Sequence, residues 1–211
     1  MIFNSDYLTI KNTKKKEFSL KININNEKNI ILWEKVLFKH FKIKKKTNKE
    51  FIINAEKIEK LSKLLKNNKI NYHIVLKLLD DISKQIFSLK KNRYGIIQFD
   101  IDDIIIVDGE NFLFINPNKI EKERSKKLYI DKIIKKNNFS SPEIINLVSI
   151  PNKIHYKTSI YSLAIICIYC LTKKNNGDPL KLIDYIYGTK LYWSIERCLD
   201  KNPMNRFLYI I

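Results

Sequence analysis

The sequence is poor in the residue types that cross-link chains or build tight phosphate-binding loops. It has three cysteines and four glycines in 211 residues, and no glycine precedes Gly95. An odd number of free thiols fits a reducing compartment. Cys167 and Cys170 have the Cys-x-x-Cys spacing of some metal and redox sites, but no second cysteine pair or histidine lies near them. We therefore favour core packing for both cysteines over metal or redox chemistry.

Long apolar runs are also missing. Residues 1–10 have no apolar run before a small-residue cleavage site, so no secretory signal is predicted. The uncharged run Ile160–Leu171 would reach about 18 Å as a helix, short of the bilayer core of about 30 Å. Its length favours a helix over a buried strand, and Thr158 or Ser159 could cap its start. We expect a helix buried on all sides, no membrane segment, and a cytoplasmic protein.

Arginine is scarce although the chain is strongly basic. The formal net charge is +18, yet only four arginines occur, at 93, 124, 197 and 206. Such an excess attracts nucleic acid or an anionic surface. The lysines are spread along the chain, however, and arginine is the usual bidentate reader of phosphate and guanine. A solvated surface in a chain rich in Lys, Asn and Ile is the favoured interpretation, with weak, nonspecific nucleic-acid binding as the alternative.

Hydrophobic periodicity and turn residues predict a mixed order of elements. The clearest is a helix over 72–91 with Asn71 as its cap, because apolar residues recur there in steps of three and four. Asp108-Gly109 between two β-branched or aromatic runs predicts a hairpin. The other expected elements are hairpins over 6–11 with 17–24 and 41–45 with 50–54, helices over 27–40, 54–66, 179–187 and 190–200, a loop over 117–140 that could include one helical turn, and a short helix from Pro142.

This order predicts an α+β fold. Residues 1–54 would form a reduced first lobe of β-strands with one helix, and residues 55–211 a mainly helical part around a buried helix near 159–171. Trp33 and Trp193 are expected to anchor the core or the interface between the two parts. The apolar fraction of 45% is enough for a sizeable core.

An acidic stretch after residue 99 is the main candidate for chemistry. Asp100, Asp102 and Asp103, with Asp108 beyond them, could hold a metal, and alternation would put Asp100 and Asp102 on one face of an extended segment. A solvated loop with a turn aspartate is the favoured alternative. The three histidines, at positions 40, 73 and 155, lie far apart and are expected to be structural or exposed.

Four local motifs resemble the C-terminal lobe of the eukaryotic protein kinase fold, over about residues 51–211. Ser141-Pro142-Glu143 resembles the Ala-Pro-Glu that closes a kinase activation segment. Ser159-Ile-Tyr-Ser-Leu-Ala164 resembles the Asp-x-Tyr/Trp-Ser-Leu-Gly that opens the central helix. Cys198-Leu-Asp-Lys-Asn-Pro-Met-Asn-Arg206 resembles the Cys-Leu-x-x-Asp-Pro-x-x-Arg near the kinase C-terminus, and Asp103-Ile-Ile-Ile-Val-Asp-Gly the catalytic loop and its hairpin. The whole chain is also similar to shortened kinase-like proteins of large DNA viruses.

The resemblance implies that the catalytic positions are degenerate. If Asp103 holds the place of the magnesium-binding Asn, the catalytic Asp falls at Gln98 and the magnesium Asp of Asp-Phe-Gly at Asn116. No Gly-x-Gly-x-x-Gly and no positioned phosphate-binding lysine are found upstream. Ser159 replaces the Asp that tethers the catalytic loop, which implies an unanchored loop.

The fold residues of the family, by contrast, are retained. Glu143 and Arg206 remain, and the resemblance implies a buried pair between them. Retention of fold residues with loss of chemistry is typical of a pseudokinase, so the leading hypothesis is a catalytically inactive, kinase-like protein that binds another protein, with no cofactor. A degenerate but active kinase that uses Asp100, Asp102 or Asp103 for metal, with ATP and magnesium, is the first alternative. A basic nucleic-acid-binding module is the second.

Overall fold

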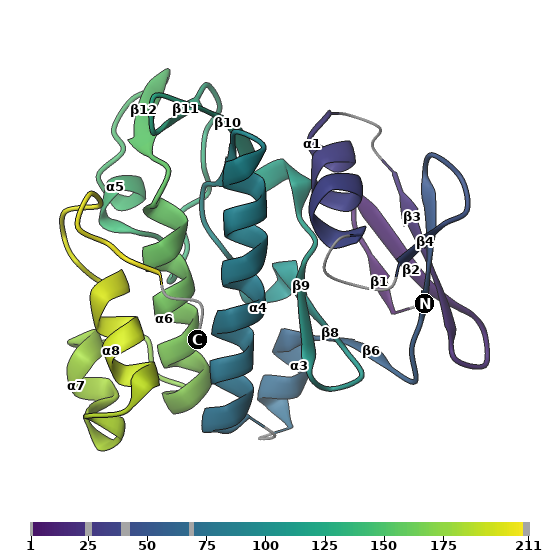
Figure 1. Ribbon diagram of the computed structural model, residues 1–211. Helices are drawn as coiled ribbons and strands as arrows, with labels where there is room; N and C mark the ends of the chain where they lie inside the picture. The colour runs from purple at the N-terminus through teal and green to yellow at the C-terminus, as the bar shows by residue number, and fades with distance from the viewer. Residues whose placement is uncertain (1, 24–26, 39–42, 68–69, 209–211) are drawn as a thin grey trace.

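The computed structural model describes residues 2–23, 27–38, 43–67 and 70–208. Within them the fold is α+β, as predicted, with a β-rich part at one side and a mainly helical part at the other (Figure 1). His40 and the start of the second predicted hairpin, residues 41–42, lie outside the described residues.

The β-rich part is one antiparallel sheet of order β1-β2-β3-β5-β4. Its strands are β1 (Phe3–Asn4), β2 (Leu8–Lys14), β3 (Glu17–Ile22), β4 (Ile43–Lys45) and β5 (Glu50–Asn54). The two predicted hairpins are therefore confirmed where the structure describes them. Between them, α1 (Glu27–Ile30) continues into a π-helical segment, Ile31–Leu37, over the range expected to be helical. Trp33 is buried there and stacks on Phe51 with ring centroids 5.4 Å apart, so it anchors the core as predicted.

Two long helices form the centre of the helical part. In α4 (Tyr72–Lys91) the side chain of Asn71 accepts a hydrogen bond from the backbone N–H of Ile74 at 3.0 Å, so both the helix and its cap are confirmed. The apolar run near 159–171 is the helix α6 (Thr158–Thr172), which is almost fully buried and packs beside α4 (Figure 1). The predicted N-caps of α6 are wrong, because Thr158 and Ser159 lie inside the helix and the N-cap position is Lys157.

Two expectations for the middle of the chain are wrong. Residues 54–66 do not form a single helix: they contain β6 (Ile58–Lys60), which pairs with β8 (Ile104–Val107), and the short helix α3 (Leu61–Lys66). The predicted loop over 117–140 contains two strands, β10 (Ile120–Arg124) and β11 (Lys127–Ile130). These strands join β7 (Tyr94–Ile96) and β12 (Asn152–His155) in a second sheet of order β12-β11-β10-β7.

The predicted hairpin at Asp108-Gly109 and the predicted short helices after it agree better with the structure. Asp108 and Gly109 form the turn between β8 and β9 (Asn111–Phe114), both with positive φ, at 54° and 78°. The short helix α5 (Pro142–Ile145) begins at Pro142, and α7 (Pro179–Leu182) and α8 (Lys190–Cys198) follow α6. Trp193 on α8 is 40% exposed, so the prediction of a core or interface anchor is wrong for this residue.

One continuous hydrophobic core runs through the sheet of β1–β5 and the central helices. Cys167, Cys170 and Cys198 are free and buried in it, and burial raises the pKa of Cys170 and Cys198 to about 12. These thiols pack as apolar groups, as expected. Within the described part of the chain, none of the helices combines the length and apolarity needed to span a bilayer.

Candidate functional site

The acidic stretch lies between β7 and β8 and is a tight turn, not an extended segment. Residues 101–103 form a single 3-10 turn, and Asp100 caps it by accepting a hydrogen bond from the backbone N–H of Asp102 at 3.3 Å. In return, the Asp103 carboxylate accepts from the backbone N–H of Asp100 at 3.1 Å. The expected alternation of Asp100 and Asp102 on one face is therefore wrong, because the turn rotates each side chain differently.

The three carboxylates point to different partners. Asp100 Oδ2 accepts a hydrogen bond from Asn137 Nδ2 at 3.1 Å, and Asp102 Oδ1 accepts from the Ser62 hydroxyl at 2.6 Å. Asp103 points into the protein. Among the residues that the structure describes, no group of three or more acidic, His or Cys side chains is arranged to hold a metal.

Asp103 is the buried centre of the site. Its Oδ2 lies 2.5 Å from the Lys119 ammonium, and its Oδ1 accepts a hydrogen bond from Asn116 Nδ2 at 2.6 Å. Burial raises the pKa of the Asp103 carboxyl above its ordinary value, while Lys119 and Asn116 oppose that shift. Both oxygens of this carboxylate are thus occupied by donors from the chain itself.

The other two positions singled out by the resemblance are also hydrogen-bonded. Asn116 Oδ1 accepts from the backbone N–H of Asn118 at 3.0 Å, which uses the remaining polar atom of that amide. Gln98 is 3% exposed, and its amide donates to the Lys135 carbonyl and accepts from the Ser140 hydroxyl, both at 2.7 Å. The structure therefore brings Asn116 to Asp103, but it ties Gln98 to the segment 135–140.

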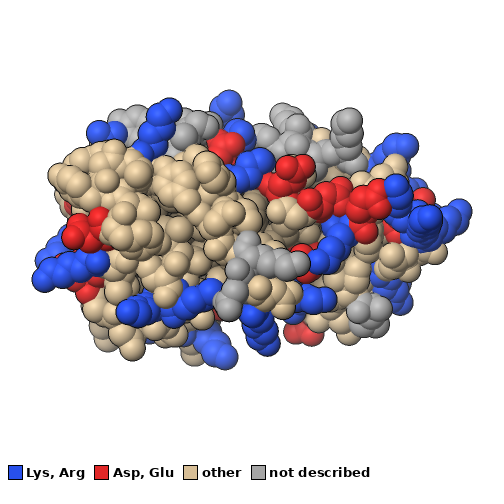
Figure 2. Space-filling view, turned by 90° about the horizontal axis from the view of Figure 1, so that it is seen from below, with Lys and Arg blue, Asp and Glu red and all other residues tan. Residues whose placement is uncertain are grey.

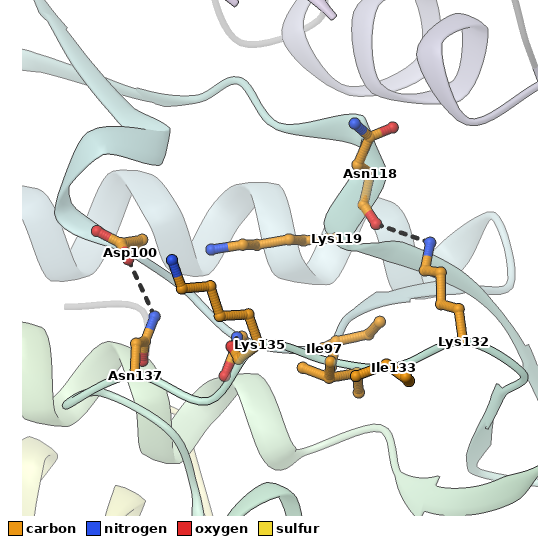
Figure 3. A pocket seen from close by; sticks show the side chains of 10 residues that line it. Ile97, Asp100, Asn118, Lys119, Lys132, Ile133, Lys135 and Asn137 are labelled. Carbon is orange, nitrogen blue, oxygen red and sulfur yellow. Dashed lines mark hydrogen bonds between the residues drawn. The ribbon is translucent and has the colours of Figure 1, made fainter. Parts of the chain in front are cut away.

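A pocket of about 250 Å³ opens beside Asp100 (Figure 3). Its lining comes from the acidic turn, from the 3-10 turn Pro117–Lys119 and from the segment after β11, namely Ile97, Gln98, Asp100, Asn118, Lys119, Lys132, Ile133, Ile134, Lys135 and Asn137. In Figure 3 the amino groups of Lys119 and Lys135 point toward the side of the pocket where Asp100 lies. Asp100, two residues after Gln98, is thus the carboxylate that the structure places in the pocket.

Tyr7, in the turn between β1 and β2, lies close to this acidic turn. Burial raises the pKa of Tyr7, and the nearby charges of Asp103, Asp102 and Asp100 raise it further. Sequence reasoning missed both Tyr7 and Lys119. Lys119 is one lysine among many, and the approach of Tyr7 depends on packing between segments about a hundred residues apart.

The residues of the retained motifs meet between α5, α6 and the C-terminal segment. The hydroxyl groups of Ser141 and Thr158 hydrogen-bond each other, and Pro142 occupies the first turn of α5. Arg206 Nη1 lies 2.7 Å from Glu143 Oε1, so the predicted pair is present. The contact has the distance of an ion pair, although Glu143 makes no aligned hydrogen bond with Arg206.

The segment that the resemblance compares with a catalytic loop is tethered to α6, by a residue other than the one at the expected position. The backbone N–H of Phe99 donates to Ser162 Oγ at 2.8 Å, and this hydroxyl lies on α6. Ser159 instead faces the Tyr156 carbonyl at 3.5 Å. The expectation that Ser159 leaves the loop unanchored is therefore wrong, because a serine one turn later supplies the acceptor.

A scan against protein-family models finds no family that matches the chain, and a search of curated proteins finds no significant match.

Proposed function

We propose that this protein is a kinase-like protein that transfers no phosphate and acts by binding another protein. The observation that carries the proposal is the contact between Lys119 and Asp103: an ammonium of the chain lies against the carboxylate to which the resemblance assigns the family's magnesium-binding position. The five-stranded sheet with one helix, packed on a helical part around α6, supports the kinase-like resemblance. We assign residues 1–54 and 55–211 to its two lobes.

Phosphoryl transfer needs metal ions to neutralise the charge of the phosphates. Magnesium prefers oxygen ligands in octahedral geometry. Here Asn116 offers Asp103 an NH₂ group, and Lys119 already neutralises the same carboxylate. A divalent ion at this place would have to displace a half-buried, hydrogen-bonded cation, which opposes its binding.

The N-terminal part of the chain, residues 1–54, also differs from that of an active kinase. A glycine-rich turn lets the backbone approach phosphates closely, since only glycine has no Cβ. The turn between β1 and β2 instead carries Tyr7, which lies near Asp103. No glycine precedes Gly95, so no turn in residues 1–54 has the freedom that a glycine-rich phosphate loop needs.

Exposed aromatic side chains supply a surface for a protein partner. Tyr185, Tyr187 and Trp193 are 66%, 64% and 40% exposed, and the rings of Tyr187 and Trp193 lie 5.4 Å apart. Figure 2 shows uncharged side chains gathered over the end of the molecule formed by α7 and α8. Tyrosine and tryptophan dominate binding energy at protein interfaces, and clustered exposed apolar groups mark such sites. We assign partner binding to this cluster.

The buried free thiols are consistent with action in the cytoplasm, where cysteines stay reduced. Residual phosphoryl transfer is the second candidate, and the half-buried Asp100 in the pocket is the observation that favours it.

Thermal unfolding with magnesium and ATP tests the first part of the proposal. A ligand present at about a hundred times its Kd stabilises the folded state by about 2.7 kcal/mol. We expect no magnesium-dependent rise in Tm with millimolar Mg-ATP, compared with sodium chloride of equal ionic strength. A clear rise, together with label transfer from ATP that disappears in Asp100→Asn, would establish the second candidate in its place.

Affinity capture from native cells with quantified recovery tests the second part. The variant Tyr187→Ala/Trp193→Ala should lose the proteins that the natural chain retains, since large aromatic groups of the cluster are removed. Lys181→Ala on α7 is the matched control, because this lysine is exposed and lies outside the aromatic cluster. Equal recovery with all three chains would contradict the assignment of this surface.

A further inference from the structure

The sheet of β10, β11 and β12 has one buried face and one exposed, cationic face. Leu128, Ile130 and Ile154 point inward and are buried. Because side chains alternate along a strand, the residues between them point outward. Pairing places Arg124 opposite Lys127 and Tyr129 opposite Lys153. These four exposed residues, Arg124, Lys127, Tyr129 and Lys153, are termed the sheet platform below.

The cations of the platform have no acidic partner within the described residues. No hydrogen bond or ion pair is formed there by the side chains of Arg124, Lys127 or Lys153. Tyr129 stands between them with 47% of its surface exposed. Three unpaired cations around one open aromatic ring are therefore available to a ligand.

The platform forms one wall of a groove of about 940 Å³, whose other wall includes Glu27 and Lys28 of α1. The acidic residues of the groove are largely neutralised. Glu121 is bound by Lys28 at 2.6 Å and by Lys132 at 3.0 Å, and Glu27 by Lys122 at 2.8 Å. Asp131 remains as the one groove carboxylate that makes no ion pair among the described residues. The net field of the groove is positive.

We propose that the sheet platform binds single-stranded nucleic acid. Lysine and arginine along a groove neutralise a phosphate backbone, and an exposed aromatic ring on a sheet stacks on an unpaired base. An acidic peptide would pair with the cations but would leave the face of Tyr129 without a partner. A duplex keeps its bases stacked on one another, so it too would leave the ring uncovered. This inference is independent of the protein-binding surface on α7 and α8.

The test is fluorescence anisotropy with labelled oligo-dT and oligo-U at several salt concentrations. Tyr129→Ala should weaken binding by roughly 5- to 150-fold, the equivalent of one lost base stack, and Tyr129→Phe should bind like the natural chain. The variant Arg124→Ala/Lys127→Ala/Lys153→Ala should lower the slope of log affinity against log salt by about 2, as expected for three lost phosphate contacts.

The matched control, Lys181→Ala/Lys190→Ala/Lys201→Ala, removes the same charge from exposed positions near α7 and α8. It should change the slope little. All substituted positions are exposed, and circular dichroism would verify that each variant is folded. An equal fall of the salt slope in the two triple variants would overturn the proposal, because binding would then depend on the overall charge of the chain and not on the platform. Tighter binding of duplex, or displacement of the oligonucleotide by a poly-glutamate peptide at equal charge, would also overturn it.

Discussion

Glu143 and Arg206 join two segments that are distant in sequence, with Nη1 of the arginine 2.7 Å from Oε1 of the glutamate. The guanidinium is completely buried and also donates from Nε to the Asp200 carbonyl at 2.8 Å. It lies over the ring of Tyr161, 5.0 Å from the centroid. One side chain thus fastens the C-terminal segment to both α5 and α6.

Glu143→Ala should destabilise the protein by about 3–5 kcal/mol, because it leaves the Arg206 charge buried without its partner. Chemical denaturation measures this loss. Glu110→Ala is the control, since Glu110 is exposed and forms no ion pair among the described residues, and a surface change usually stays within about 0.5 kcal/mol. Equal losses of stability in Glu143→Ala and Glu110→Ala would show that the pair does not stabilise the fold.

Lys119→Met should also destabilise the fold at neutral pH, again by about 3–5 kcal/mol, because Asp103 would lose its cation while remaining buried. The double variant Lys119→Met/Asp103→Asn removes both charges and should recover part of the loss. Lys181→Met controls for the change in side-chain type. If the double variant is no more stable than Lys119→Met, charge compensation between Lys119 and Asp103 does not stabilise this site.

The stability difference between the natural chain and Asp103→Asn should decrease as the pH rises. Burial raises the pKa of Asp103 above its ordinary value. Between the two pKa values, the folded state therefore holds a proton on Asp103 that the unfolded state has released. The stabilisation that results is fully present below the ordinary pKa of Asp, and it is lost as pH rises through the pKa of the folded state. Urea unfolding between about pH 3 and pH 7 measures the difference. An increase with pH would mean that Lys119 outweighs burial and lowers the pKa.

Restoring acids at the two degenerate positions should not create a kinase. In Gln98→Asp/Asn116→Asp, the first substitution puts a carboxylate where Gln98 now donates to the Lys135 carbonyl, and the second puts one against Asp103. Both places disfavour a new negative charge. We expect a less stable protein whose label transfer from ATP equals that of the natural chain. Turnover above that background would show that a working nucleotide site exists.

Gly95→Ala should cost about 1–3 kcal/mol, since overpacking forces neighbours out of place. Gly95 lies on β7, and a Cβ there would come within 2.8 Å of a Leu128 methyl carbon. In the background Leu128→Ala the same substitution should cost clearly less, because the clashing methyl group is gone. Thermal denaturation of the four chains measures this coupling, and additive losses would place the strain elsewhere.

Elements set by local sequence were the ones that could be predicted. The helix over 72–91 has a continuous apolar stripe and a capping Asn71, and Asp108-Gly109 has the residue types that positive φ requires. The hairpin of β10 and β11 has no such signal. Ser125 and Lys126 form its turn with φ of 51° and 63°, although neither is Gly or Asn. β6 has three residues and exists because it pairs with β8 more than forty residues later.

In the candidate site, too, some features could be predicted from the sequence and others could not. Glu143 and Arg206 could be paired in advance because the motifs around them resemble those that carry a buried pair in the kinase family. Lys119 could not be chosen from so many lysines, because its role depends on which one reaches Asp103 in three dimensions. Ser162 could not be predicted as the tether, because the resemblance implies a charged residue at position 159, whereas a hydroxyl one turn later accepts the hydrogen bond from Phe99.

A lysine that stands beside Asp103 differs from a metal ion in one respect that matters in the cell: it cannot leave. The chain supplies its own counterion at an effective concentration set by covalent connection, so dilution and chelators do not remove it. The centre of the molecule should therefore keep the same charge and shape whether magnesium is abundant or scarce.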